Sequence, residues 1–133
     1  MATDGLITLR SNHGPEETMN RLECQVRGSG MKVVAHIDHS AAAARAGLLL
    51  RPTDLLVFGA PASGTPLMQA NQAVGIDLPL KVLVWRDEEG ATWLAYSDPR
   101  WIALRHGLDP ALDAAAAALG ARLDALARAA TSP

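Results

Sequence analysis

The stretch Lys81–Tyr96, KVLVWRDEEGATWLAY, decides the fold class of this chain. Two runs rich in β-branched and aromatic residues, Lys81–Arg86 and Thr92–Tyr96, flank the turn-forming segment Asp87–Gly90. A segment of this length that ends in glycine favours a tight antiparallel hairpin. Strands and helices alternate earlier in the chain, but the hairpin argues against a doubly wound fold. We therefore predict an α+β fold: a mixed, largely antiparallel sheet of about four or five strands, with helices packed mainly on one face.

The remaining elements follow from periodicity and from residues that start or stop helices. Further strands are predicted at 6–10, 32–38 and 55–58. Helices are predicted from Pro15 to Gly28, from Ser40 to Ala46, from Thr65 to Ala73 and from Pro99 to Gly107, and a long C-terminal helix begins at Asp109-Pro110. In the strand 32–38, simple alternation places Val33, Ala35 and Ile37 on one face and Val34, His36 and Asp38 on the other.

The length and charge of the chain narrow the classes of function. A chain of 133 residues fits one domain. We divide it into an α+β part, residues 1–107, and a C-terminal helical extension of the same domain, residues 108–133. The 12 basic and 14 acidic side chains give a net charge of -2, and neither sign forms a long block. Binding to a nucleic-acid backbone is not expected from such a balance.

The N-terminus and the cysteine content predict a location. Met1–Gly5 has neither the basic start nor the apolar run of a signal peptide, and no run of eighteen apolar residues occurs. The single cysteine, Cys24, has no partner for an internal disulfide, which favours a reducing compartment. We therefore expect a cytoplasmic protein that does not span a membrane.

Several short motifs, separated along the chain but in a fixed order, resemble one bacterial family. They are Ile37-Asp38-His39, Leu50-Arg51-Pro52-Thr53, Phe58-Gly59, Gly64–Gln69, Ile76–Lys81, Trp93 and Tyr96-Ser97-Asp98-Pro99. On these motifs the chain resembles domain-of-unknown-function family 302 over about residues 4–107. The resemblance implies an α+β sandwich and a tendency to form dimers. It implies no established activity, and the cofactor, if there is one, is unknown from the sequence.

Two positions depart from the pattern of that family. Ala60 follows the Phe58-Gly59 pair, where the resemblance leads us to expect asparagine, and Ala62 stands where many members carry lysine. Any role that depends on that amide or that ammonium group is therefore in doubt for this chain.

The segment Gly59–Gly64, followed by Thr65-Pro66, is the most suitable place for a small ligand. Glycines allow a close approach of the backbone, and the free N–H groups at a helix start attract anions. We predict a small-anion site formed by Gly59, Ser63, Gly64 and Thr65, completed by His39, Asp77 and Lys81. In the alternative reading, Thr65 caps its own helix and the glycines form a tight turn.

The sequence leaves two other chemical roles open. His39 could act as a general base oriented by Asp38 or Asp77, which would make the chain a small enzyme. His36, Asp38 and His39 could ligate a metal ion such as zinc. The alternative to both is local hydrogen bonding, with Asp38 or Ser40 capping the following alanine-rich helix.

The C-terminal helix carries a narrow apolar seam. Its members step by three and four residues: Leu112, Ala116, Leu119, Leu123, Leu126 and Ala130. Such a seam pairs with its twin in a homodimer or folds back on its own sheet, and the pattern allows both. The prediction that emerges is a homodimeric binding module for a small anion or metabolite, with the enzyme and metal-binding hypotheses as its rivals.

Overall fold

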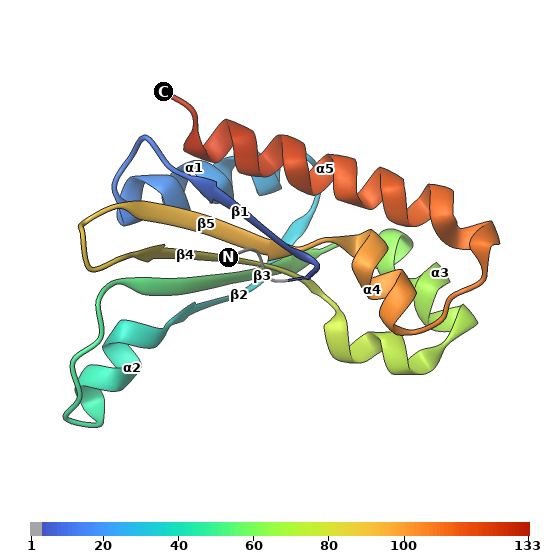
Figure 1. Cartoon of the computed structure of the whole chain (residues 1–133), viewed down its shortest axis with the longest axis horizontal. Coiled ribbons are helices and arrows are strands. Elements are labelled where there is room, and N and C mark those ends of the chain that lie inside the picture. Colours follow the sequence, from blue (N-terminus) through green and yellow to red (C-terminus); the bar gives the residue numbers. More distant parts are fainter. Residues whose placement is uncertain (1–3) are drawn as a thin grey trace.

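The computed structural model describes residues 4–133, so Met1–Thr3, part of the segment examined for a signal peptide, lie outside the described residues. The strands are β1 Leu6–Arg10, β2 Lys32–Asp38, β3 Thr53–Gly59, β4 Leu80–Arg86 and β5 Thr92–Ser97. The α-helices are α1 Pro15–Gly28, α2 His39–Arg45, α3 Pro61–Ala70, α4 Pro99–Arg105 and α5 Asp113–Thr131 (Figure 1). Short 3₁₀ helices span Gln72–Asp77 (η1) and Pro110–Leu112 (η2).

The strands form one open sheet in the order β1-β5-β4-β3-β2. All four pairs between neighbouring strands are antiparallel, so the predicted α+β class and largely antiparallel sheet are confirmed. The parallel component of the expected mixed sheet is not present among the described strands. The sequence order is shuffled because α1 separates β1 from β2 and allows β1 to pair at the far edge, with β5.

The predicted hairpin supplies two adjacent inner strands of the sheet, β4 and β5. Trp85 and Trp93 are directly opposite in the β4–β5 register. In the turn, Asp87 accepts hydrogen bonds from the Glu89 and Ala91 amides at 3.0 and 2.9 Å and from the Trp93 indole at 2.7 Å. The indole bond, followed by the two amide bonds, lowers the pKa of Asp87.

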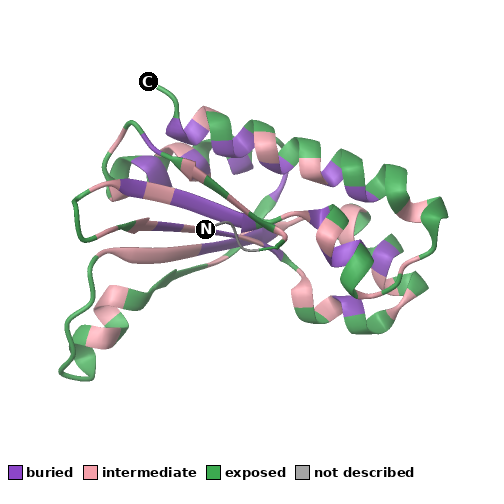
Figure 2. Cartoon of the chain, viewed as in Figure 1, coloured by how far each residue is buried: buried purple, intermediate pink, exposed green. Residues whose placement is uncertain are grey.

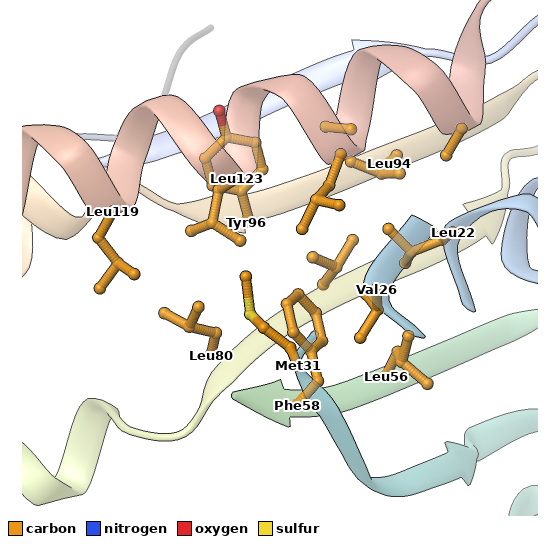
Figure 3. Packing of buried hydrophobic residues seen from close by; sticks show 14 of the residues in the cluster. Leu22, Val26, Met31, Leu56, Phe58, Leu80, Leu94, Tyr96, Leu119 and Leu123 are labelled. Carbon is orange, nitrogen blue, oxygen red and sulfur yellow. The ribbon is translucent and has the colours of Figure 1, made fainter. Parts of the chain in front are cut away.

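The core lies between one face of the sheet and the two long helices (Figures 2 and 3). From α1 it takes Met19, Leu22 and Val26, and from the sheet it takes residues such as Leu56 and Phe58. The seam of α5 is buried in the same core at Ala116, Leu119, Leu123, Leu126 and Ala130. The C-terminal helix therefore folds back on its own chain, and a homodimer formed through this seam is ruled out.

The other face of the sheet is not covered by α1 or α5. Strand pairing places Ile37, Leu55, Leu83, Trp85 and Trp93 together on this open face. Leu55, Leu83 and both tryptophans are only partly buried, and Ile37 is exposed. Polar residues such as Arg10, Thr53 and Lys81 share this face, so it is mixed, whereas the open face of an antiparallel sheet is commonly polar.

A β-bulge in β2 corrects the predicted alternation of this strand. Val33 pairs with Phe58, but the next paired residue, Ala35, pairs with Val57, so the register shifts across Val34. Beyond the shift, His36 pairs with Leu56 and therefore lies on the helix-covered face together with Val33. An inserted residue of this kind turns the following side chains to the opposite face, which strict alternation does not allow for.

The segment predicted as a loop before Thr65 is helical. Helix α3 begins at Pro61, after the extended residue Ala60, and runs through Thr65 and Pro66 without a break. Pro61 and Pro66 both suit the first position of a helix, and α3 begins at Pro61. The capping role considered for Thr65 is therefore wrong.

The connection between β2 and β3 projects from the body as an arm, residues 39–52 (Figure 1). Its helix α2 buries none of its own residues. Leu48, Leu49 and Leu50 follow it and are all exposed, Leu49 completely. Three consecutive exposed leucines on a projecting arm are unusual for a surface that meets only water.

Candidate functional site

A pocket opens beside the start of α3, where β2, β3, the segment before β4 and α5 meet. Its volume is about 470 Å³, within the range of small-molecule sites. The lining residues come from these places and from the first residue of β4: Lys32, Val34, Gly59, Ala60, Pro61, Ser63, Gly64, Thr65, Met68, Leu78, Pro79, Leu80 and Leu119. The structure thus brings together Gly59, Ser63, Gly64 and Thr65, the core of the predicted site.

The walls of this pocket are mostly apolar. Met68, Leu78, Leu80 and Leu119 supply side chains without charge or hydrogen-bonding capacity. The absence of a side chain at Gly64 keeps this wall open. A Cβ atom at that position would lie only 3.3 Å from Leu78 Cδ1, which is a tight contact. The surface is suited to an apolar molecule, and a bare inorganic anion would find few polar partners in it.

Cations stand at the edge of the pocket and not within its apolar wall. Lys32, at the start of the edge strand β2, lines the pocket and is exposed. Arg122 of α5 is not among the lining residues but reaches the rim at Ser63. Its Nη1 lies 3.4 Å from the Oγ of Ser63, and its Nη2 lies 3.4 Å from the carbonyl oxygen of Ser29, with which it lines a neighbouring hollow. Sequence reasoning missed Arg122, because a single arginine off the α5 seam gives no local signal of its place in the fold.

One wall of the pocket is held in place by Asp77. Its carboxylate accepts a hydrogen bond from Arg105 Nη1 at 3.0 Å and lies 2.6 Å from His106 Nε2. Asn71 adds a bond from its side-chain amide to the His106 carbonyl at 3.2 Å. These contacts tie η1, and with it Leu78 and Pro79, to α4. Asp77 therefore has a positioning role here and does not meet His39.

His39 lies at the other end of the β2–β3 ladder from the pocket. Lys32 pairs with Gly59 at one end of the ladder, and Asp38 pairs with Asp54 at the other. Six residues of strand separate the two ends, about 20 Å. Figure 1 shows α2, which begins at His39, and α3 at opposite ends of the molecule. The expectation that His39 and the segment 59–66 form one recess is wrong.

The catalytic grouping around His39 is not formed either. Asp38 is the N-cap of α2: its Oδ1 accepts hydrogen bonds from the Ala41 amide at 2.8 Å and the Ser40 hydroxyl at 2.7 Å. The amide bond, followed by the hydroxyl bond, lowers the pKa of Asp38. Within residues 4–133, no side-chain hydrogen bond joins His39 to either predicted carboxylate. The alternative reading of Asp38 as a cap is confirmed.

The predicted metal ligands do not converge. The bulge turns His36 toward α1, where its Nδ1 lies 3.3 Å from Glu23 and its Nε2 lies 2.9 Å from Asp54. The two ring nitrogens point in different directions, so these carboxylates do not face one common ion. Across residues 4–133, no cluster of three or more histidine, cysteine or acidic side chains is arranged to hold a metal.

Lys81, the remaining predicted site residue, lies on the open face of the sheet. It is opposite Val57, and its Nζ donates to the carbonyl of Pro79 at 3.1 Å. It does not line the pocket, and the carboxylate of Asp77 is paired with Arg105. Alternation along β4 explains its place, since Leu80 and Val82 take the core side.

A separate groove between the sheet edge and α5 is polar. Tyr96, Asp98, Arg100, Asp124 and Arg128 line it, and each arginine is paired with an aspartate. Burial, followed by the nearby charges of Asp124 and Asp98, raises the pKa of Tyr96 to about 12. The phenol is thus protonated throughout the neutral range, and the charges of the groove are already balanced.

The family assignment follows from a match across almost the whole chain. The model of the family described as "Domain of unknown function DUF302" matches residues 7–127. The chain belongs to the DUF302 family. The match ends inside α5, so it covers much of the segment predicted as a C-terminal extension.

A solved structure agrees with the fold of this DUF302 chain. The uncharacterized conserved protein DUF302 from Bacillus stearothermophilus superposes with a TM-score of 0.85 and 26% sequence identity. The superposition covers 96% of this chain and 99% of that protein.

Curated relatives from Brucella are more similar in sequence but much longer. Proteins named fluoride-specific ion channel FluC 1 from Brucella suis biovar 1 and Brucella abortus biovar 1 are each 44% identical over 115 residues. The match takes in 86% of this chain but only 45% and 43% of those proteins. The DUF302 chain therefore spans less than half the length of these relatives. Among residues 4–133, no helix combines the length and apolar character required of a membrane span.

Proposed function

We propose that this DUF302 chain is a small-molecule-binding module that acts as a homodimer in the bacterial cytoplasm. The pocket beside α3 is the observation that carries the binding role: about 470 Å³, with mainly apolar walls and a few polar groups at its edge. Pockets with this combination are the usual location of small ligands. The exposed and unpaired Cys24 fits a reducing compartment.

The binding role is tested by filling the pocket. Gly64→Leu places a branched side chain against Leu78, whereas Ala62→Leu adds the same group on the exposed side of α3, outside the pocket. With octanoate as the probe, calorimetry is expected to show at least about tenfold weaker binding for Gly64→Leu and wild-type binding for Ala62→Leu. Equal binding by both variants, or none by the wild type, would contradict the proposal.

The homodimer is supported by the open sheet face and the arm. Five strands about 4.8 Å apart and about six residues long make a face on the order of 500 Å². A specific interface buries about 800 Å² on each partner, and the leucines 48–50 of the arm add apolar area toward that value. A second copy is the favoured occupant, because two-fold symmetry lets each arm and each face serve both partners.

Light scattering on the full chain tests the dimer. The expected mass is twice the 14.0 kDa of one chain. A mass of 14.0 kDa at concentrations well above micromolar would contradict a homodimer and would favour a different protein on the open face.

The names of the Brucella relatives describe whole proteins, of which only a part matches this chain. They refer to proteins more than twice as long as the matched part. We propose that the equivalent region of those proteins is a binding domain appended to the remainder, and that this chain has no channel activity of its own. The enzyme reading with His39 as general base receives no support from the observed geometry.

A further inference from the structure

We infer that the ligand of the pocket is a small amphiphile: an apolar chain or ring that carries one anionic group. This inference rests on the proposed binding function and specifies its ligand. The apolar part would lie between Met68, Leu78 and Leu119, and the anionic group would lie at the rim between Lys32 and Arg122.

The two rim cations are free of carboxylates. Among residues 4–133, neither Lys32 nor Arg122 has an acidic oxygen within 4.0 Å, whereas Arg100, Arg105 and Arg128 are each paired. A cation that has no partner of its own, beside an apolar cavity, attracts the charged end of a ligand whose other end enters the cavity.

Arg122 is also held only by weak contacts. Its bonds to the Ser63 hydroxyl and the Ser29 carbonyl are both 3.4 Å long, near the limit for a hydrogen bond. Since Ser63 lines the pocket, a carboxylate at its hydroxyl would lie within reach of the guanidinium and would form a shorter, charge-assisted bond.

The size and the apolar walls of the pocket limit which molecules can serve as the apolar part of the ligand. At about 30 Å³ for each non-hydrogen atom, the share of one water molecule in the liquid, a pocket of about 470 Å³ has room for roughly 16 such atoms. That size suits a short chain or a single ring. An inorganic anion would leave the apolar walls facing water, so it gains nothing from most of the cavity.

Calorimetric titration of the full chain tests this ligand class with octanoate, 1-octanol, inorganic phosphate and sodium fluoride as probes. The double variant Lys32→Met/Arg122→Gln removes the rim charges. The control Arg27→Met/Arg128→Gln removes two exposed arginines that belong neither to the pocket nor to the open face and the arm.

Octanoate is expected to bind the wild type and the control about tenfold more tightly than 1-octanol. In the double variant this preference is expected to fall to within about twofold, since the charge contacts contribute the difference. Phosphate and fluoride are expected to give no measurable heat at millimolar concentration.

An equal affinity for octanoate and 1-octanol, or an unchanged preference in the double variant, would refute the anionic head group but leave the pocket as a binding site. Tight binding of phosphate or fluoride alone would refute the amphiphile in favour of a simple anion. Absence of binding by all four probes would overturn this inference and the proposed binding function together.

Discussion

The two ends of the β2–β3 ladder differ in how many other elements pack around them. At the Lys32–Gly59 end, α3, η1 and α5 close around the strands and leave one apolar pocket. At the Asp38–Asp54 end, the chain runs out into an arm that buries none of its helix and exposes Leu48–Leu50. The difference indicates a division of labour: one end is suited to a small ligand, and the other to a protein surface.

The largest effect that would sharpen this comparison is expected at the arm. Leu48→Asp/Leu49→Asp places two charges on the surface proposed to meet a second copy, and the dimer is expected to weaken at least about 100-fold. Light scattering across a concentration series measures the change. Leu104→Asp, at a leucine that is also exposed but lies on α4, is the matched control and should leave the dimer intact. If both variants dissociate equally, the arm has no special place in the interface.

The next effect is expected at the pocket end. Val34 lines the pocket beside Lys32 in the bulge of β2. Val34→Glu introduces a carboxylate that competes for the rim cations, so octanoate affinity should fall about tenfold, while Val34→Gln should change it by less than about threefold. Calorimetry gives both affinities, and light scattering should show no change in mass. Equal losses of octanoate affinity in the two variants would show that the added charge is not the cause.

As the pH falls, amide hydrogen exchange is expected to become faster in the arm before it does so around the pocket. The bonds to Ala41 and Ser40 lower the pKa of Asp38, so its stabilising charge is complete above the ordinary carboxyl pKa and is lost as the pH falls through the lower folded value. Hydrogen exchange by mass spectrometry, corrected for intrinsic rates, should show severalfold faster exchange in α2 below about pH 4 than at pH 6. The variant Asp38→Ala should show the fast exchange at both pH values. Uniform loosening of α2 and α3 would contradict a local effect.

The smallest effect is expected for His39→Ala. Because His39 lies about 20 Å from the pocket along the ladder, octanoate affinity should change by less than twofold. A loss comparable to that of Val34→Glu would restore the single recess that the sequence predicted.

The parts of the fold that were predictable rest on local signals. The β4–β5 hairpin, the start of α1 at Pro15 and the start of α4 at Pro99 were found where turn and helix-start residues predict them. Gly59, Ser63, Gly64 and Thr65 line one pocket, as their closeness in sequence allows.

The errors came from information that is not local. A single inserted residue, Val34, turned His36 to the helix-covered face, and no propensity marks such a bulge. Thr65 is the better capping residue and favours a helix start at Pro66, yet α3 begins at Pro61 after Ala60, which makes no side-chain cap. The cation at the rim, Arg122, comes from a helix about sixty residues away, so only the folded chain places it beside Ser63.

Backbone amide NMR of the labelled chain during an octanoate titration tests the division of labour most directly. The account predicts chemical-shift changes concentrated at Lys32–Val34, Gly59–Met68 apart from the prolines, and Leu119–Arg122, with the amides of His39–Arg45 unmoved. Changes centred on His39–Arg45, or spread evenly over the sheet, would contradict it.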